Sequence, residues 1–596
     1  MTRQPGRLDA IAIATFFALL TGILEACGFL FQSLVRHRLV WVSTDVVWMS
    51  PLSYLVFYLA FALPLVAIGL VRRRPIGIAW LAGIYTFISL LSLMLPFTQI
   101  ALVASAILAA GAALQLGHTI GRAGDAWMRR FRRGALALTG LVVVAGVAVR
   151  AGLAVREHRA LAALPAFDRG APNILLIVLD TVRRSNLSVY HYHRPTSPRL
   201  EEWARSSVVF DGATVAAPWT LPSHASIFTG LAHGALSTDW QIPLDGRPRT
   251  LAEVLRAHGY LTGGFVGNLL YTAWSSGLSR GFVHYDDYVV SPVLVMLHSS
   301  LGRSSLYNAL RFSFPRPRPM ARALRNFELR KSVNAGDRER SAESVADSFL
   351  AWQRTAGPRP FFAFLNFFDA HNQRQAPDRW LATFGGQHPS RVDLYDGALA
   401  YLDHEVGRIL DSLQQRGVLD RTIVVVTSDH GEQFGEHKLY SHGNSLYLPV
   451  LDVPLVIRFP GAVPAGRRVA QLVSLRDLAA TILDLAGIQD HDGIPGTSLA
   501  GTWRDSVSAP RTPLLSELTK GINVDSLRPN ARGDMSDLLD ERWHYIRGGW
   551  GREELYAWPS DTLELTNLVA APQAAPDLAR LRRQLDSALT DARRRR

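Results

Sequence analysis

The sequence predicts an α/β protein with a membrane anchor: an N-terminal bundle of about five transmembrane helices, then a domain built on a mainly parallel sheet. Three observations lead to this prediction. Apolar stretches of about 20 residues recur within the first 153 residues. After residue 172, continuous apolar runs alternate with helical patterns. The formal charge of +13 is uneven, because residues 1–153 carry a net +9 from arginines between apolar stretches. This placement favours a membrane-topology signal over nucleic-acid binding.

Five apolar stretches are long enough to cross a bilayer, whose hydrocarbon core of about 30 Å needs about 20 helical residues. They lie near 10–35, 51–71, 76–96, 97–117 and 134–153. With the N-terminus in the cytoplasm, ten arginines lie in inside segments, and only Arg36 and Arg38 lie in outside loops before the fifth span. We therefore expect a multi-pass protein of the cell (inner) membrane whose chain lies outside the cytoplasm after about residue 154.

Polar residues within this apolar region have two interpretations each. Glu25 falls in the middle of the first span, where a carboxylate is a functional candidate, although a hydrogen bond between helices of the bundle is the more ordinary explanation. The stretch 122–133 (RAGDAWMRRFRR) fits a short interfacial helix or an ordinary cytoplasmic anchor. Cys27, the only cysteine, lies in the first span, which excludes an intrachain disulfide and a cysteine-based zinc site.

After residue 172 the pattern is that of an α/β domain. Apolar runs at 173–180, 361–367, 422–428 and 454–459 are typical of strands buried on both faces of a parallel sheet. Apolar residues recur every three to four positions in 391–415, and helices also fit 198–206, 249–258 and 474–486. Ligands of such sheets gather at the carboxyl ends of strands.

Polar motifs follow the predicted strands at those ends. Two of them are FFDAHNQ (367–373) and SDHGEQFGEHKLYSHGN (428–444). APWTLPSHASIFTG (217–230) predicts a helix beginning near Thr220, because Pro222 is tolerated in a first helical turn, and a helix N-terminus favours anions. The side chains that these motifs and the end of the first strand offer are Asp180, Thr220, Asp369, His371, Asp429, His430, His437 and His442.

Two aspartates, a histidine and a hydroxyl suit a divalent cation. A metal placed between a hydroxyl and a phosphate or sulfate ester lowers the pKa of the hydroxyl and neutralises the ester. Further histidines can hold the ester oxygens or protonate the leaving alcohol. Each motif alone is weak evidence for such a metal site, and the order of the motifs at successive strand ends is much stronger evidence.

The order of these motifs resembles the sulfatase family of the alkaline phosphatase superfamily over roughly 172–570. NILLIVLDT, TLPSHASIFTG, DAH, SDHGEQFGEH and VPLVIRFPG carry the resemblance, together with the late EELYAWPSDTLELTNL. It implies an alkaline-phosphatase/sulfatase-like α/β/α sandwich with a small C-terminal α+β subdomain. The expected boundaries are a transmembrane domain at 1–153, a linker at 154–171, a catalytic domain at 172–500, and a C-terminal subdomain with a helical tail at 501–596.

The resemblance also implies roles for individual residues. One divalent metal ion (Ca, Mn, Mg or Zn) would be bound by Asp180, Thr220, Asp429 and His430, with Thr220 as the nucleophile. His371 matches the family's oxyanion-binding histidine, and His442 matches the position beside the leaving group. His224 stands where the family has arginine, and Asn268 is the polar residue of GFVGNLL (264–270), where the family has Lys-x-His. These last two are candidates for substrate binding.

Two departures from the family pattern bear on the chemistry. Thr220 replaces the cysteine or serine that hydrolytic sulfatases oxidise to formylglycine, and Thr181 replaces a second acidic ligand. A simple alcohol would form a sulfo-enzyme with no hemiacetal route for release, which favours phosphoryl over sulfuryl transfer. A membrane anchor with a threonine nucleophile also resembles the phosphoethanolamine and phosphoglycerol transferases of the superfamily, although that branch usually has glutamate where this chain has Asp180.

Three functions remain open from the sequence. The leading one is a membrane-anchored, metal-dependent hydrolase of sulfate or phosphate esters. The second is a phospholipid headgroup transferase that modifies an envelope glycan or lipid, and the third is a degenerate member that binds without turnover. The expected partners are a sulfated or phosphorylated envelope glycan or lipid and the bilayer, with no nucleic acid.

Each site residue also has a plainer interpretation. Thr220 would serve as a helix-capping hydroxyl, and Asp180, Asp429 and His430 as a structural salt-bridge cluster. His224 would lie on the helix surface, and His437 and Lys438 on a solvated loop. The arginine-rich stretch 292–340 is interpreted as a mobile basic excursion or a substrate-facing insertion.

Overall fold

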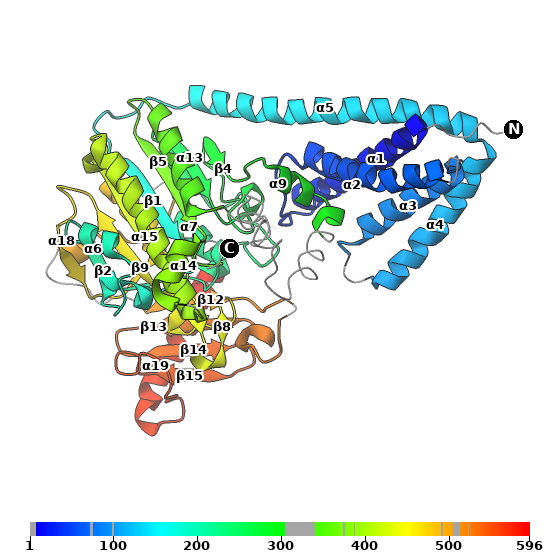
Figure 1. Cartoon of the computed structure of the whole chain (residues 1–596). Coiled ribbons are helices and arrows are strands. Elements are labelled where there is room, and N and C mark those ends of the chain that lie inside the picture. The colour runs from blue at the N-terminus through cyan, green and yellow to red at the C-terminus, as the bar shows by residue number, and fades with distance from the viewer. Residues whose placement is uncertain are drawn as a thin grey trace. The chain divides into compact units, whose positions relative to one another are not determined.

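The computed structural model describes residues 7–71, 76–97, 100–303, 340–372, 376–386, 388–489, 493–504, 513–522 and 524–596. The chain forms two compact units (Figure 1): Met1–His158 with Tyr288–Asp337, and Arg159–Asp287 with Arg338–Arg596. Within the basic stretch 292–340, residues 304–339 lie outside the described residues. The described beginning of that stretch belongs to the same unit as the N-terminal helices.

The N-terminal part of the chain is helical: α1 (Arg7–Leu34), α2 (Val46–Val71), α3 (Ile78–Met94), α4 (Leu102–Arg122) and α5 (Gly124–Ala162). Among the described residues, four of these helices, all except α3, are long and apolar enough to cross a membrane. α3 has 17 residues and is about 26 Å long at 1.5 Å per residue. The predicted five spans are therefore four candidate spans and one shorter apolar helix.

Glu25 joins three segments of the first unit. Ser50 Oγ of α2 donates to Glu25 Oε2 at 2.8 Å, so the helix–helix hydrogen bond expected for Glu25 is present. The backbone N–H of Ser300 donates to Glu25 Oε1 at 2.9 Å. Ser300 follows α9 (Pro292–Leu297), and Ser53 of α2 donates to the carbonyl of Met296 in α9 at 2.7 Å. The beginning of the basic stretch is thus packed against α1 and α2.

Helix α5 is continuous over 39 residues and about 58 Å. It includes most of the stretch 122–133, which is therefore not a separate short helix, and it continues into the predicted linker as far as Ala162. Arg132 pairs with Asp9 of α1, and Arg150 pairs with Asp45 at 2.6 Å. These ion pairs attach α5 to the first turn of α1 and to the residue that precedes α2.

The second unit is built on one large sheet, which has nine strands in the described part of the chain, in the order β10-β2-β9-β6-β1-β5-β3-β4 with β11 beside β2. The strands are β1 (Asn173–Leu179), β2 (Val208–Thr214), β3 (Leu261–Val266), β4 (His284–Asp286), β5 (Phe361–Phe367), β6 (Thr422–Thr427), β9 (Asp452–Arg458), β10 (Arg467–Val469) and β11 (Val473–Ser474). The four predicted strands are β1, β5, β6 and β9.

The sheet is mixed because β9 pairs antiparallel with both of its neighbours, whereas the other strand pairs in the described part of the sheet are parallel. For two neighbouring strands to be parallel, a crossover must carry the chain back to the end of the sheet where the first strand began. Residues 428–451, which join β6 to β9, contain only the hairpin β7 (Gln433–Phe434) with β8 (Tyr440–Ser441), a short 3-10 turn and α16 (Leu448–Leu451). Because this connection does not cross to the other end of the sheet, β9 begins at the end where β6 finishes and runs antiparallel to it.

Helices cover both faces of this sheet, as a sandwich requires. Alternate residues of β5, such as Ala363 and Leu365, share one core with helices α6 (Pro198–Ala204), α13 (Ala342–Thr355) and α15 (Arg391–Gln415). Phe364 points to the opposite face and meets Phe228 of α7 (Thr220–Thr229), with ring centroids 4.9 Å apart. The remaining helices are α8 (Leu251–Ala257), α14 (Asp378–Gly385), α17 (Leu478–Leu485) and α18 (Gly501–Arg504).

A smaller antiparallel sheet forms the C-terminal subdomain. Its strands are β12 (Leu514–Leu518), β13 (Met535–Leu539), β14 (His544–Gly548) and β15 (Glu553–Tyr556), paired in that order. The terminal helix α19 (Ala575–Arg594) buries Leu578, Leu581 and Leu585 in the same core as Tyr545 and Leu555 of the sheet. This agrees with the α+β subdomain that the sequence resemblance implies.

Candidate active site

The carboxyl ends of neighbouring parallel strands bring the site residues together. β6, β1, β5 and β3 lie side by side and run in the same direction. Asp180 directly follows β1, Asn268 follows β3, and Asp429 and His430 follow β6. Thr220 is the first residue of α7. The prediction that these motifs meet at one edge of the sheet is confirmed.

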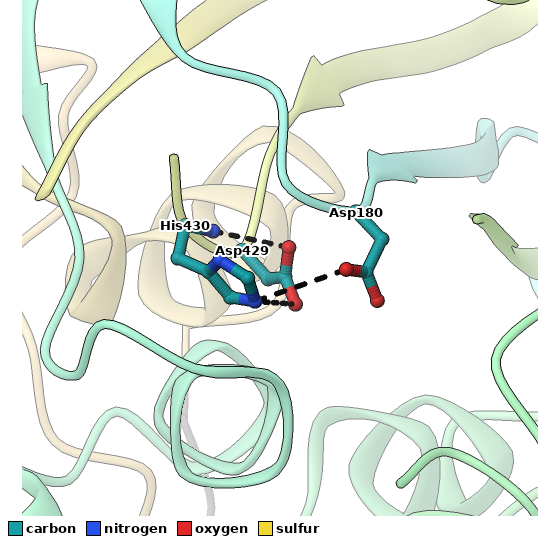
Figure 2. A group of neighbouring side chains, drawn as sticks. All are labelled: Asp180, Asp429 and His430. Carbon is teal, nitrogen blue, oxygen red and sulfur yellow. Dashed lines mark hydrogen bonds and ion pairs between the residues drawn. The ribbon is translucent and has the colours of Figure 1, made fainter. Parts of the chain in front are cut away.

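Asp180, Asp429 and His430 form a compact cluster. Each offers one possible ligand atom, and these atoms all lie within 4.8 Å of one another. His430 Nε2 is 3.7 Å from Asp180 Oδ1 and 3.4 Å from Asp429 Oδ2. Figure 2 shows the imidazole and the two carboxylates turned toward one another. All three side chains are fully buried.

No cation of the described chain neutralises the two carboxylates. Their ion-pair partners there are His224 and His430. Burial lowers the pKa of both histidines to about 4, so both rings are neutral at pH 7. Burial also raises the pKa of Asp429 to about 8 and that of Asp180 well above its ordinary range. A structural salt bridge therefore does not account for the cluster.

The cluster has the donor set of a divalent-metal site. Asp180 Oδ1 and Asp429 Oδ2 are buried and have no hydrogen-bond partner in the described part of the chain. A buried carboxylate oxygen without a partner is costly, and a bound cation would satisfy both oxygens and keep both carboxylates ionised. Two hard oxygen ligands with an imidazole suit the metals expected from the sequence. The residues present therefore fit a divalent ion.

The hydroxyl of Thr220 lies against the same cluster. Thr220 Oγ1 is 3.5 Å from Asp180 Oδ2 and 3.4 Å from His430 Nε2. The N-cap position of α7 is Trp219, and no side chain caps the helix, so the capping interpretation of Thr220 is wrong. The first turn of α7 instead directs unpaired N–H groups and the positive end of the helix dipole toward this region.

Asn268 and His224 occupy different sides of Thr220. Asn268 Nδ2 donates to Asp180 Oδ2 at 2.8 Å and to Thr220 Oγ1 at 3.3 Å. His224 lies one turn along α7, fully buried, with Nδ1 2.8 Å from the carbonyl oxygen of Thr220 and 3.4 Å from Asp429 Oδ2. The surface interpretation of His224 is therefore wrong. Substrate binding by either residue stays a prediction.

His371 and His442 lie beside the cluster and have the greatest exposure among the predicted site residues, both being partly exposed. The ring of His442 is 4.3 Å from that of His430 and 5.0 Å from that of His371, centroid to centroid. Burial lowers the pKa of His442 to about 4, with a further contribution from the positive charge of Arg528. Solvent therefore reaches the site from the side of these two histidines.

Sequence reasoning missed Glu432, which contacts His442. Glu432 Oε2 lies 3.2 Å from His442 Nδ1, and burial raises the pKa of Glu432 to about 7. Glu432 thus lies within hydrogen-bonding distance of His442. Its position in the same SDHGEQ motif as Asp429 and His430 is the signal that would have found it.

Thr181, which the sequence marks only as the replacement of a second acidic ligand, has a positive φ of 63°. A β-branched residue is strained in this left-handed region, and such strain persists where the surrounding structure imposes it. The amide of Thr181 donates to Asp429 Oδ1 at 3.3 Å, and its carbonyl accepts from Tyr395 Oη at 2.8 Å. Thr181 thus orients Asp429 by its backbone.

Two residues of the motifs lie outside the cluster. Asp369 accepts a hydrogen bond from the backbone N–H of Ala342 at the beginning of α13, and it is not part of the metal-ligand group. His437 stacks on Tyr447 at 3.6 Å, and its Nε2 is 3.1 Å from the carbonyl oxygen of Leu563. His437 therefore packs against the protein and is half-buried.

Comparisons with known proteins identify the family of the second unit. Residues 172–488 match the family model described as Sulfatase, and residues 435–591 match the model described as N-sulphoglucosamine sulphohydrolase, C-terminal. The second match covers the C-terminal subdomain and overlaps the end of the first. The two models together span the large sheet and the small one.

The individual relatives share 31% or less of their aligned residues with this chain in the two alignments that follow. The chain is 31% identical to the choline-sulfatase of Rhizobium meliloti (strain 1021) over 189 residues, which are 31% of this chain and 35% of that protein. It is 23% identical to an arylsulfatase of Clostridium perfringens (strain 13 / Type A) over 403 residues, 56% of this chain and 80% of the relative. The first of these alignments spans about a third of the relative's length.

The fold is also that of a solved hydrolase. The structure of the phosphonate monoester hydrolase of Agrobacterium radiobacter superposes with a TM-score of 0.53 at 20% sequence identity. The superposition covers 71% of this chain and 96% of that structure. At this identity the likeness supports the fold and leaves the choice of substrate open.

Proposed function

Because this chain belongs to the sulfatase family, we propose that it is a metal-dependent hydrolase that cleaves sulfate or phosphate esters with Thr220 as the nucleophile. The observation that carries the proposal is the position of Thr220 Oγ1, within 3.5 Å of both Asp180 Oδ2 and His430 Nε2, beside two buried carboxylate oxygens that have no hydrogen-bond partner in the described chain. We propose Asp180, Asp429 and His430, together with the Thr220 oxygen, as the metal ligands.

Thr220 and Asn268 have different roles in the first step of ester cleavage. A bound divalent ion supplies positive charge that stabilises the ionised hydroxyl and the ester oxygens. Thr220 Oγ attacks the phosphorus or sulfur atom, and its proton passes to a neighbouring base or to water. The bond from that atom to the ester oxygen breaks as the new bond forms. Asn268 Nδ2, 3.3 Å from Thr220 Oγ1, orients the attacking oxygen.

His442 is placed to protonate the departing alcohol, and Glu432 is placed to return a proton to His442. The pKa of Glu432 is raised to about 7 by burial, so near neutral pH a fraction of Glu432 is protonated beside His442 Nδ1. Water then attacks the same phosphorus or sulfur atom, and the bond from that atom to Thr220 Oγ breaks. Thr220 Oγ regains a proton, and the released phosphate or sulfate carries the oxygen of the water. His371, whose ring is 5.0 Å from that of His442, is positioned to hold an oxygen of the ester.

We propose that the N-terminal helices anchor this activity in the cell membrane, with the catalytic domain outside the cytoplasm. The four candidate spans and the arginine distribution support this location. A membrane anchor combined with a threonine nucleophile also favours a second candidate. In that case Thr220 accepts a phospholipid headgroup and passes it to an envelope glycan or lipid instead of to water.

The test uses the purified full chain with manganese or calcium and two reporters, 4-nitrophenyl phosphate and 4-nitrophenyl sulfate. We expect Thr220→Ala to lower kcat by about 10³-fold or more, and Thr220→Ser to retain part of the activity. Thr229→Ala, which removes a hydroxyl that bonds within the same helix α7, is the matched control and should keep the wild-type rate. Full activity in Thr220→Ala would overturn the nucleophile assignment.

Intact-mass measurement separates the two candidate functions. After incubation with phosphatidylethanolamine or phosphatidylglycerol vesicles, a headgroup adduct that Thr220→Ala lacks would support transfer. Release of inorganic phosphate or sulfate from soluble esters, without an adduct from lipid, would support hydrolysis.

A further inference from the structure

Asn366 is the only polar residue of β5 (Phe361–Phe367, FFAFLNF), and the proposed reaction does not use it. All seven residues of this strand are buried, and Asn366 is fully buried. A polar side chain in a buried apolar strand lowers stability unless its hydrogen bonds are made, so its presence calls for an explanation. β5 lies between β1 and β3, the strands that Asp180 and Asn268 follow.

The side chain of Asn366 contacts the segment that follows β3. Its Oδ1 accepts the backbone N–H of Asn268 at 2.9 Å, and the hydroxyl of Thr272 lies 3.5 Å from the same oxygen. Side chains alternate along a strand, so Asn366 points to the same face of the sheet as Phe364, whose ring meets α7. Thr220 is the first residue of that helix. Asn366 therefore holds the backbone of Asn268 on the side of the nucleophile.

The backbone of β5 fixes the ends of both neighbouring strands. The carbonyl of Asn366 accepts the N–H of Gly267 at 2.8 Å, and the carbonyl of Phe367 accepts the N–H of Asp180 at 2.8 Å. A Cβ on Gly267 would lie 3.0 Å from the carbonyl oxygen of Asn366, so glycine permits this close approach. Two consecutive residues of β5 thus hold Asp180 on one side and the residue before Asn268 on the other.

The contacts of Asn268 allow only one orientation of its side-chain amide. Asn268 Oδ1 accepts the backbone N–H of Leu270 at 3.0 Å and that of Tyr271 at 3.1 Å. Because both partners are donors, the amide oxygen must face them, and Nδ2 must face the reaction centre. Nδ2 then donates to Asp180 Oδ2 at 2.8 Å and to Thr220 Oγ1 at 3.3 Å. A displacement of the Asn268 backbone would move Nδ2 away from both.

We propose that Asn366 is a positioning residue, which holds the backbone of Asn268 so that the Asn268 amide reaches Thr220. The same amide then also contacts the proposed metal ligand Asp180. This role rests on the proposed function, in which Thr220 attacks the ester. Stability alone does not explain Asn366, because its own Nδ2 is buried and has no hydrogen-bond partner in the described part of the chain. A buried donor without a partner is costly, whereas the oxygen of the same side chain serves Asn268.

The test measures kcat and KM of the purified full chain with 4-nitrophenyl phosphate and 4-nitrophenyl sulfate. We expect Asn366→Leu, which removes the acceptor at similar size, to lower kcat by about 10- to 100-fold, as the loss of a residue that orients a direct contact does. KM should change by less than about twofold, because Asn268 orients the attacking oxygen rather than the substrate. Thr262→Val, which removes a buried hydroxyl near the beginning of β3, is the matched control and should keep the wild-type kcat.

A double-mutant cycle with Asn268→Ala separates positioning from a general loss of structure. The amide is absent in Asn268→Ala, so adding Asn366→Leu should lower kcat no further if Asn366 acts through that amide. An equal further loss in this background would overturn the proposal, as would a wild-type kcat in Asn366→Leu alone. If Asn366→Leu does not fold, Gly267→Ala, which crowds the carbonyl of Asn366, takes its place in the cycle with the same expected result.

The proposed function and the positioning role can fail separately. If the wild-type chain cleaves neither ester, the proposed function fails, and crystal structures of the wild-type chain and of Asn366→Leu then test the positioning role directly. We expect Asn268 Nδ2 to leave hydrogen-bonding distance of Thr220 Oγ1 in the variant. An unchanged position of the Asn268 amide would overturn the positioning role, whether or not the chain is active.

Discussion

His544 in the C-terminal subdomain provides a quantitative test of the buried electrostatics. This histidine is fully buried on β14, with Nε2 2.9 Å from Asp537 Oδ2 and Nδ1 hydrogen-bonded to Glu564. Both ring nitrogens donate to carboxylates, which requires the protonated imidazolium. Burial opposes this charge, but the two carboxylates outweigh burial and raise the pKa of His544 to about 10.

The magnitude follows from the difference between the folded and unfolded pKa values. A rise from about 6.5 to about 10 corresponds to about 5 kcal/mol, because one pKa unit is about 1.4 kcal/mol. The folded state binds the proton more tightly, so this stability is fully present below about pH 6.5. It is lost as the pH rises through about 10. Between pH 6.5 and pH 9.5 the free energy of unfolding of the subdomain should fall by about 3–4 kcal/mol.

The assay is pulse proteolysis of the full chain across a urea series at pH 6.5 and at pH 9.5, with cleavage in the C-terminal subdomain as the readout. We expect His544→Gln to destabilise the subdomain by about 3–5 kcal/mol at pH 6.5, because it leaves two buried carboxylates without their cation. The same variant should lose most of the pH dependence. His258→Gln, at an exposed position after α8, is the control and should behave as wild type. A wild-type pH dependence that persists in His544→Gln would refute the reasoning.

Three further predictions concern the site and the anchor. Asp429→Asn should weaken binding of manganese, measured by calorimetry, by at least about 100-fold, whereas Asp369→Asn, a buried carboxylate outside the cluster, should bind it normally; equal losses would contradict the ligand assignment. In the wild-type chain kcat should decline as the pH rises through about 7, because the protonated Glu432 carboxyl is the form that supplies a proton to His442. Glu432→Gln should abolish this decline, and an unchanged pH profile would exclude the proton relay. Glu25→Ala should lower stability to denaturation in detergent micelles by about 1–3 kcal/mol. Glu25→Gln should restore most of it, because its amide oxygen can accept from the Ser300 N–H and its amide nitrogen can donate to Ser50 Oγ. A glutamine variant as unstable as the alanine variant would point to a role for the charge itself.

Apolar runs identified strands correctly but carried no information on direction. β9 has the same apolar character as β1, β5 and β6, and all four are buried. Its antiparallel orientation depends on the loop 428–451, which returns from the edge where β6 ends. The same limit applies to the membrane region, where hydropathy located the apolar helices but overestimated the length of α3.

The spacing of apolar residues also did not predict that α7 is buried on all sides. All ten of its residues are buried, so the helix has no polar face that would mark one side as surface. For this reason His224 was compatible with a surface position in the sequence, although it lies beside Asp429 in the structure. The contact between Glu25 and Ser300 joins residues 275 positions apart, and no local pattern predicts such a pairing.

The sequence by itself determined which polar side chains follow the strands of the large sheet. Strand propensity and the order of the polar motifs placed Asp180, Thr220, Asp429 and His430 at the ends of strands or the start of a helix, and parallel strands bring such ends together. Only the tertiary structure decided that two carboxylate oxygens lack hydrogen-bond partners in the described chain, that Glu432 contacts His442, and that Trp240 lies close to Gly443. Burial and proximity are properties of surfaces from distant parts of the chain, so they arise only when the sheet, its helices and the C-terminal subdomain pack together.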